Sequence, residues 1–291
     1  MRWNTDALFQ RIGRQMGWDR DALFRDIEID AEKLAKLRRK PRAEKTLAIH
    51  FTPRSGSSWL TDIIAQSGAL GAAREFFNPK RLPKMAQAPG ARDLDSYIDL
   101  LGRRFGAGGV FSFEITAHQL RAVFPDTDTF IAHFGAVPAV WLIRRDIVAQ
   151  AVSLAKMVST SVSHTPLAST DSRAAAEAAF AYDAALIRRW LTHILVAERE
   201  SEALFAAHAI RPLRLSYEGI MAAGADATLA QLAAHIGVAA LPPTPPEPRH
   251  SKLGTSLNAD YAARFRREEA TFLARVEAER APWLAQLTPP A

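Results

Sequence analysis

Four short runs of β-branched, aliphatic and aromatic residues recur along this chain of 291 residues, and long stretches with helical periodicity separate them. Connections of that length are typical of helical crossovers between parallel strands rather than of hairpin turns. The pattern therefore predicts an α/β domain with a central parallel sheet of about four or five strands, helices on both faces and a ligand site at the carboxyl edge of the sheet. The runs are Thr46–Phe51, Gly109–Phe113, Ala139–Ile143 and Arg211–Leu215.

The segment before the first run has a different character. Apolar residues at helical spacing predict two amphipathic helical pieces, the second through Leu23–Ile27, before a charged stretch ends the segment. We interpret residues 1–45 as a helical N-terminal extension and residues 46–291 as the main domain. Within that domain the longest helical signal covers about 173–209, and a last helix is expected from about Asn258.

The chain contains no cysteine. Disulfides, thiolate nucleophiles and cysteine-ligated zinc are therefore excluded, and the composition fits a reducing compartment. The first residues lack the apolar segment of a signal peptide, and the longest uncharged apolar run, Thr129–Ile143, is too short to span a bilayer. The eight histidines are dispersed and form no zinc-binding motif. We expect a cytoplasmic protein with no membrane span and no bound metal.

The formal net charge is +6, which indicates an anionic partner. Nucleic acid, an acidic membrane surface and a small polyanionic ligand would all suit it. The basic clusters are not interleaved with aromatic residues, as a stacking platform for single-stranded nucleic acid requires. We therefore favour a small molecule that carries phosphate.

The first strand run ends in a polar elbow, Pro53-Arg-Ser-Gly-Ser-Ser58, and a helical pattern begins at once. The first backbone N–H groups of a helix that starts directly after a strand converge on the turn, and the helix dipole favours an anion there. Gly56 allows close approach of a ligand, the serines offer hydroxyl donors, and Arg54 adds a cation. No Gly-Lys pair follows, so an ATP-binding P-loop is not predicted.

The string Thr52-Pro-Arg-Ser-Gly-Ser-Ser-Trp59 resembles the 5′-phosphosulfate loop of sulfotransferases that use 3′-phosphoadenosine 5′-phosphosulfate (PAPS), and its form is especially similar to the bacterial Stf0 group, which includes trehalose 2-sulfotransferases. The resemblance implies the P-loop-like sulfotransferase fold. It also implies that the loop binds the 5′-phosphosulfate. Trp59 matches a tryptophan that packs on adenine in many relatives, while core packing is the alternative. The residues assigned to the phosphosulfate are Arg54, Ser55, Gly56, Ser57 and Ser58.

The second signature of these enzymes is an arginine at the end of a strand with a serine eight residues later, and the two bind the 3′-phosphate of the donor. Arg145 and Ser153 have this spacing after the third run. An arginine at the carboxyl end of a strand and a hydroxyl two turns into the next helix can face the same ligand. Two motifs in the expected order make chance similarity a poor explanation.

Other matches concern the rim of the site. Tyr217 matches a tyrosine that lies near adenine in the superfamily, and Glu218 matches a structural glutamate. Arg249 and Lys252 lie where the last segment that contacts the cofactor is found in the family, although a solvated basic turn is the alternative. The Ser159–Thr170 segment, which includes His164, is rich in serine and threonine and is expected to be a loop on the acceptor side.

Sulfonate transfer to an alcohol needs a base for the hydroxyl proton. Glu75 matches the glutamate of the Stf0 group that is proposed as this base, and a surface carboxylate paired with Arg74 is the structural alternative. His118 is the rival base, since other sulfotransferases have a catalytic histidine after the second strand. Glu114 is a departure, because relatives tend to have a lysine near this position.

The resemblance implies an enzyme that transfers a sulfonate group from PAPS to a hydroxyl of a carbohydrate, glycolipid or other small molecule, leaving adenosine 3′,5′-bisphosphate (PAP). Two other functions stay open from the residues alone. A nucleotide-sugar glycosyltransferase is suggested by the D-x-D string at Asp126–Asp128, although it follows a proline in an apparent turn. A non-catalytic nucleotide or nucleic-acid binder would use the elbow only to hold phosphate. Homodimers occur in the Stf0 group, and this sequence does not fix the oligomeric state.

Overall fold

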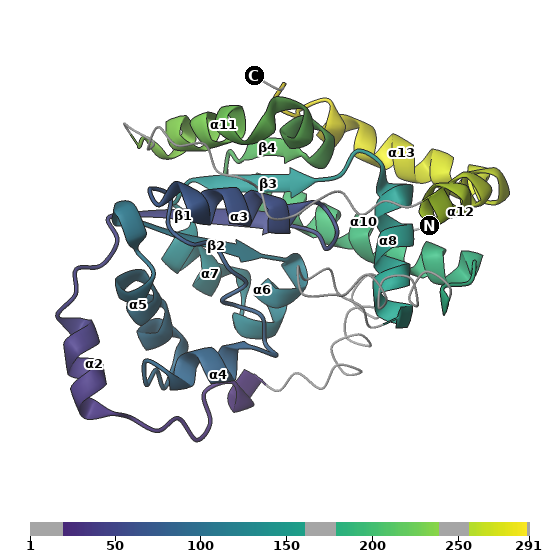
Figure 1. Ribbon diagram of the computed structural model, residues 1–291. Helices are drawn as coiled ribbons and strands as arrows, with labels where there is room; N and C mark the ends of the chain where they lie inside the picture. The colour runs from purple at the N-terminus through teal and green to yellow at the C-terminus, as the bar shows by residue number, and fades with distance from the viewer. Residues whose placement is uncertain (1–19, 161–178, 239–255, 290–291) are drawn as a thin grey trace.

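A four-stranded parallel sheet lies at the centre of the computed structural model, which describes residues 20–160, 179–238 and 256–289 (Figure 1). Its strand order is β2-β1-β3-β4, and every neighbouring pair is parallel. The predicted α/β class with a central parallel sheet is confirmed, with four strands. The strands are β1 (Lys45–Phe51), β2 (Val110–Ile115), β3 (Ala139–Ile143) and β4 (Leu213–Ser216). The last strand starts after Pro212, whose ring nitrogen cannot donate to the sheet.

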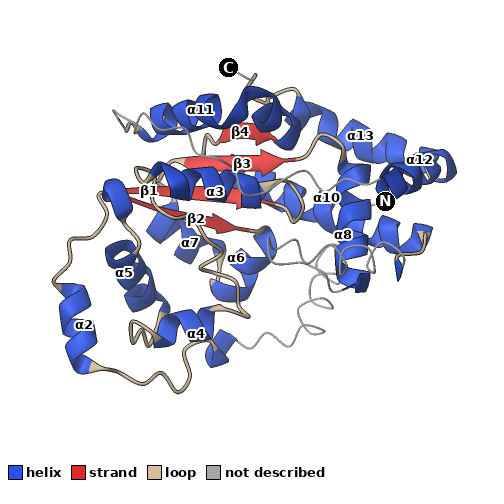
Figure 2. Cartoon of the chain, viewed as in Figure 1, coloured by secondary structure: helices blue, strands red, loops and turns tan. Residues whose placement is uncertain are grey.

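Helices cover both faces of the sheet (Figure 2). Alternate strand residues such as Leu47 and Leu142 pack on one face against α3 (Ser57–Ser67) and α11 (Tyr217–Ile236). On the other face, Trp141 of β3 contacts Phe205 of α10 (Ala184–Ala207) and Trp283 of α13 (Ala270–Leu284). The strands are buried on both faces, and this explains why they read as nearly continuous apolar runs.

Further helices pack around the edge of the sheet that β2 forms and around its carboxyl end. An aromatic cluster centred on Phe77 joins the β2 edge to the helices beside it. Figure 2 shows α8 and α12 at the carboxyl end of the strands. The bounds are α4 (Leu82–Gln87), α5 (Leu94–Arg104), η2 (Ala107–Gly109), α6 (Ala117–Val123), α7 (Thr127–Phe134), α8 (Ile147–Thr160) and α12 (Ser256–Glu268).

The segment before β1 differs from the expected pair of helical pieces. Its described part contains a short 3-10 turn, η1 (Arg20–Ala22), and α2 (Ala31–Arg38). Leu23–Ile27 is not an α-helix, because Asp26 has a positive φ of 56°, which a right-handed helix cannot contain. Leu23 and Ile27 are nevertheless buried against the domain. Residues 1–19 lie outside the described residues.

The long helix α10 begins later than the predicted start near residue 173. Asp183 caps it by accepting a hydrogen bond of 2.9 Å from the Leu186 N–H group, and residues 180–183 are not helical. Residues 161–178 are outside the described part of the chain. The last helical region is split into α12 and α13, and its start at Ser256 agrees with the prediction. Within the described ranges, no helix is both long and apolar enough to cross a membrane.

The strand order places a topological switch point beside β1. From β1 the chain crosses to β2 on one side, and it then returns to β3 on the other side of β1. In open parallel sheets, ligands bind outside the carboxyl ends of the strands at such a point. The elbow after β1 and the arginines after β3 flank this position.

Candidate functional site

The elbow connects the end of β1 to α3 through two residues with positive φ. Arg54 has φ of 69° and Gly56 has φ of 89°. The positive φ is unusual for an arginine, and such backbone conformations persist where the surrounding structure holds them. No side chain caps the first turn of α3, so its leading N–H groups face the elbow without a side-chain acceptor.

Gly56 is required by a close contact as well as by its backbone angle. A Cβ atom at this position would lie 2.5 Å from Cδ2 of Tyr217, the first residue of α11. The guanidinium of Arg144 lies 4.8 Å from the centroid of the same tyrosine ring, within the range of a cation–π contact. Tyr217, which sequence matching placed near the adenine, is thus in contact with the elbow and with the end of β3.

The serines of the elbow have different environments. Ser55 is fully buried, and its hydroxyl has no hydrogen-bond partner among the residues that the structure describes. Ser57 is buried at the start of α3, while Ser58 is exposed. A buried hydroxyl without a partner is unusual in a folded protein and fits a position that a ligand oxygen completes. Trp59 is 7% exposed and packs in the core on the α3 face of the sheet, so its adenine contact stays a prediction.

Arg54 links the elbow to α8. Its Nε donates a hydrogen bond of 2.9 Å to Oγ of Ser153, which joins the two predicted phosphate motifs directly. Burial lowers the pKa of Arg54 to about 10, and the charge of Arg144 acts in the same direction, whereas Tyr217 opposes the shift. The guanidinium still carries its proton at neutral pH. It is therefore a partly desolvated cation, which interacts with an anion more strongly than an exposed one.

Gln150 fixes the elbow against α8. Its Nε2 donates to Oγ1 of Thr52 and to the carbonyl oxygen of Pro53, both at 2.8 Å, and the residue is fully buried. Gln150 is not among the residues predicted from the sequence. Its position three residues before Ser153, on the same helix face, is the signal that could have identified it.

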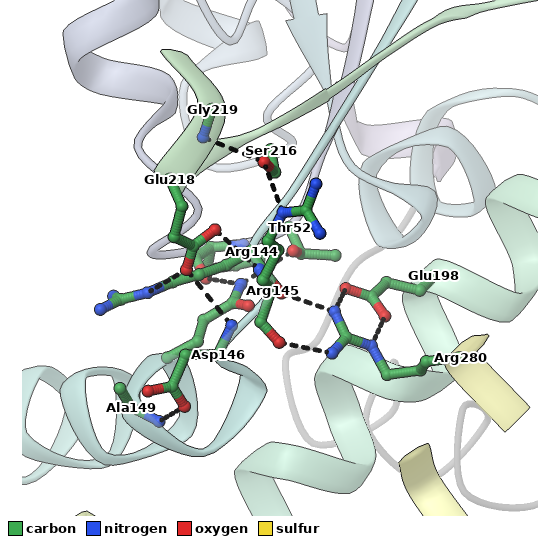
Figure 3. Close-up of polar contacts among 12 residues, drawn as sticks. Thr52, Arg144, Arg145, Asp146, Ala149, Glu198, Ser216, Glu218, Gly219 and Arg280 are labelled. Carbon is green, nitrogen blue, oxygen red and sulfur yellow. Dashed lines mark hydrogen bonds and ion pairs between the residues drawn. The ribbon is translucent and has the colours of Figure 1, made fainter. Parts of the chain in front are cut away.

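The turn after β3 contains Arg145, the residue predicted to bind the 3′-phosphate of the donor. Oε2 of Glu218 accepts a hydrogen bond of 2.9 Å from the Arg145 N–H group, and Oε1 accepts one of 3.2 Å from the Asp146 N–H group (Figure 3). The side chain of Arg145 is exposed, and its Nε lies 3.4 Å from Oγ of Ser216. Glu218 therefore has a structural role here, as the sequence match implied.

A buried ion pair between Arg280 and Glu198 contacts the same turn. Arg280 of α13 donates to both carboxylate oxygens of Glu198 of α10, at 2.7 and 3.1 Å. It also donates to the carbonyl oxygens of Arg144 and Arg145, at 2.6 and 3.0 Å (Figure 3). Neither member of this pair is predicted from the sequence, because each lies on a helix with no motif and far along the chain from the turn.

Glu75, the candidate base, lies in the connection between α3 and α4. Its Oε2 accepts a hydrogen bond of 2.8 Å from Nδ2 of Asn78 and another from Nε2 of Gln119. These two amides hold one oxygen of the carboxylate. No ion pair to Arg74 is found among the described residues, so the predicted surface pairing is absent there.

Glu114 lies beside Glu75 at the carboxyl end of β2 and is 8% exposed. Burial raises its pKa to about 8, and the negative charge of Glu75 adds to the increase, whereas Ser57 and Arg81 oppose it. Ser57 belongs to the elbow, so this carboxyl group connects the candidate base to the anion site. Glu114 is largely neutral at pH 7, and it does not supply the positive charge that a lysine would.

His118, the rival base, is buried at the start of α6. Its ring stacks on that of His193 of α10, with centroids 4.0 Å apart. Burial lowers the pKa of His118 well below its usual value, and the charges of His193 and Arg121 lower it further. The ring is therefore neutral at pH 7. The next residue, Gln119, contacts Glu75, so the two candidate bases lie in adjoining parts of the structure.

Several predicted residues lie outside the described part of the chain. They are Arg249, Lys252, His164 and most of the Ser159–Thr170 segment. The structure does describe Asp126 of the D-x-D string. Its Oδ1 caps α7 by accepting hydrogen bonds of 2.7 Å from the N–H and the hydroxyl of Thr129. No group of three residues suited to metal binding occurs in the described ranges.

Comparison with known proteins gives one clear match. Residues 97–268, more than half of the chain, match the family described as Stf0 sulphotransferase. No curated protein matches the chain significantly. The matched residues include the turn with Arg145, Ser153 and Tyr217, whereas the elbow and Arg280 lie outside them.

Proposed function

Because this chain belongs to the Stf0 sulphotransferase family, we propose that it transfers a sulfonate group from PAPS to a hydroxyl group of a small-molecule acceptor. Sulfotransferase activity follows from the family, and the glycosyltransferase alternative is set aside. The identity of the donor, the class of the acceptor and the roles of individual residues are proposed here.

The hydrogen bond between Arg54 and Ser153 carries the proposal of the donor. The 5′-phosphosulfate and the 3′-phosphate of PAPS are attached to one ribose, so the residues that bind them must lie side by side. Arg54 belongs to the motif for the first group and Ser153 to the motif for the second. The Ser153 hydroxyl accepts from Arg54 and keeps its own proton for a ligand oxygen.

The elbow fits an anionic group on further grounds. The buried Ser55 hydroxyl lacks a partner among the described residues, and the first turn of α3 has no side-chain cap. A side chain at position 56 would fill the space beneath Tyr217. In the proposed assignment, Arg54 and Ser55–Ser58 bind the phosphosulfate, while Arg145 and Ser153 bind the 3′-phosphate. Tyr217 and Trp59 remain proposed adenine neighbours, and Arg249 and Lys252 proposed cofactor contacts.

When bound, the donor supplies the sulfonate group, whose sulfur forms a bond to the acceptor oxygen as its bond to the bridging oxygen breaks and PAP leaves. Glu75 takes the proton of the acceptor hydroxyl. The amides of Asn78 and Gln119 hold its carboxylate in one orientation, as a general base requires. Arg54 places positive charge where negative charge accumulates on the leaving group. His118 is the second candidate for the base.

Binding measurements test the donor directly. In a thermal-shift titration, PAP should raise the melting temperature of the protein, and 5′-AMP, which lacks the 3′-phosphate, should do so only at much higher concentration. Transfer of labelled sulfonate from PAPS to components of a cell extract, followed by mass spectrometry, would identify the acceptor. Equal binding of PAP and 5′-AMP would contradict the proposed 3′-phosphate site.

The acceptor class is proposed from the family alone. A carbohydrate or glycolipid hydroxyl is the first choice, and the cytoplasmic location and the homodimer stay predictions. A nucleic-acid binder would behave differently, since its affinity would fall steeply with salt and show little preference for PAP.

A further inference from the structure

The turn after β3 is held on two opposite sides. Both of its carbonyl oxygens, those of Arg144 and Arg145, accept hydrogen bonds from Arg280, at 2.6 and 3.0 Å. Both of its following N–H groups, those of Arg145 and Asp146, donate to Glu218, at 2.9 and 3.2 Å. One guanidinium and one carboxylate therefore bond both the C=O and the N–H of two consecutive peptide groups (Figure 3). The Arg145 carbonyl also accepts a hydrogen bond of 3.1 Å from the Ile147 N–H group.

Arg280 is itself held in place by Glu198. It is 2% exposed, and Glu198, fully buried on α10, accepts from its Nε and Nη2. Burial raises the pKa of Glu198, whereas the charge of Arg280 and its hydrogen bond lower it. The edge of the planar guanidinium formed by Nε and Nη2 thus faces the carboxylate, while Nη2 also donates to the Arg144 carbonyl and Nη1 donates to the Arg145 carbonyl. A lysine, with a single ammonium group, cannot reproduce this arrangement.

The side chain of Arg145 starts between the two fixed peptide groups. The direction of its Cα–Cβ bond is therefore set by the main chain before any ligand arrives, and its Nε lies 3.4 Å from Oγ of Ser216. A cation that is oriented in advance loses less conformational freedom when it binds an anion than a cation on a flexible turn.

We propose that Arg280 is a positioning residue for the 3′-phosphate of the donor, and that it acts by fixing the turn from which Arg145 extends. This inference rests on the proposed donor. It goes beyond the family match, because Arg280 lies outside the matched residues, on the last helix of the chain.

Packing between α10 and α13 does not by itself explain the contacts of Arg280. A second pair, Arg199 and Glu279, joins the same two helices through hydrogen bonds of 2.7 and 2.9 Å. It occupies the neighbouring position on each helix, with the acidic and basic residues exchanged. Among the described residues, its hydrogen bonds join the two helices and do not reach the turn. The pair is partly exposed, whereas Arg280 and Glu198 are buried, and it supplies a control for the loss of an ion pair between these helices.

The test compares PAP with 5′-AMP. Dissociation constants of both ligands should be measured for the wild type, Arg280→Lys, the double variant Arg280→Met with Glu198→Met, and the control Arg199→Met with Glu279→Met. The apolar double variant avoids leaving one buried charge alone. We expect PAP binding to weaken about tenfold or more in both Arg280 variants, the size of a hydrogen bond to a charged group. Binding of 5′-AMP should change less than about twofold in these variants, and the control should retain both affinities.

A cycle with Arg145→Met separates positioning from a general loss of structure. In that background the 3′-phosphate has already lost Arg145, the residue that Arg280 positions, so Arg280→Lys should weaken PAP binding little further. Equal weakening of both ligands, or unchanged PAP binding, would overturn the inference while leaving the donor proposal intact. If the apolar double variant does not fold, Arg280→Lys and the double-mutant cycle with Arg145→Met still test the inference. Failure of the wild type to prefer PAP over 5′-AMP would instead remove the donor proposal and this inference with it.

Discussion

Nε of Arg54 donates a hydrogen bond to Oγ of Ser153, although the two residues lie 99 positions apart in the chain. The bond joins the elbow after β1 to α8, on the two sides of the topological switch point. Each residue belongs to a different phosphate motif, so a change at one should alter the contribution of the other.

We therefore expect Arg54 and Ser153 to be energetically coupled. Arg54→Lys should lower kcat/KM by about tenfold to a hundredfold, because an ammonium group cannot donate to Ser153 and to an anion in the same planar geometry. Ser153→Ala should weaken PAP binding about tenfold. Sulfonate-transfer kinetics and PAP titrations of both single variants and the double variant measure the coupling. Strictly additive effects would show that the hydrogen bond has no functional role.

Gly56→Ala should impair the elbow more than its backbone strain alone predicts. The added Cβ would lie 2.5 Å from the Tyr217 ring, at a residue whose φ is 89°. Gly68→Ala is the matched control, since Gly68 follows the other end of α3 with φ of 66° and has nothing within 4 Å of an added Cβ. The control should lose about 1–3 kcal/mol of stability from strain. Gly56→Ala should lose more and should also lose PAP binding; equal melting temperatures and unchanged binding would contradict this.

Glu75→Gln should separate binding from transfer. The substitution keeps the size of the side chain and removes the group that takes the hydroxyl proton. PAP binding should stay within about twofold of the wild type, while kcat should fall by about a hundredfold to ten-thousandfold, the range of general-base catalysis. If Glu75→Gln transfers sulfonate at the wild-type rate, the base is elsewhere, and His118→Ala becomes the next variant to measure.

Glu114 should make the protein less stable at alkaline pH. Burial raises its pKa from 4.5 to about 8, so the folded state binds a proton that the unfolded state releases between these values. This stabilising contribution is complete below pH 4.5, declines as pH rises and is lost above about pH 8. The loss is on the order of 5 kcal/mol at full ionisation.

Melting temperatures at pH 5 and pH 9 measure the effect. Between these pH values the wild type should lose more stability than Glu114→Gln, which cannot ionise. In Glu75→Gln the neighbouring negative charge is absent, so the decline should move to lower pH. Parallel pH profiles for the wild type and Glu114→Gln would show that this carboxyl group does not control the alkaline loss.

Local patterns in the sequence were sufficient to predict the strands and to select two motifs that the structure brings into contact. Gly56 and Arg54 stand in one elbow, and Arg145 and Ser153 are eight residues apart, so each motif is readable within a short window. The alternation of strand-like runs and helical stretches is also visible along the sequence, and it predicts the parallel sheet. Leu23–Ile27 does not form the predicted helix, because the positive φ of Asp26 depends on how the segment packs.

The contacts that hold the site residues in place could not be predicted from local sequence patterns. Arg280 and Glu198 lie 82 residues apart and meet only because α10 and α13 cover the same face of the sheet. Glu114 looked like a missing lysine, and only its burial beside Glu75 reveals a neutral carboxyl group. Such contacts depend on tertiary packing, which leaves no periodic signal in the chain.

The sheet order also determines which fragments of this protein can fold. The family match begins at Tyr97, within α5, and so omits β1, the strand that lies between β2 and β3. A fragment expressed with those boundaries would lack the partner shared by both neighbours and would present their unpaired edges to other chains. Such a fragment should aggregate rather than form a smaller enzyme. An expressed fragment therefore needs to start before Lys45 and extend beyond α13.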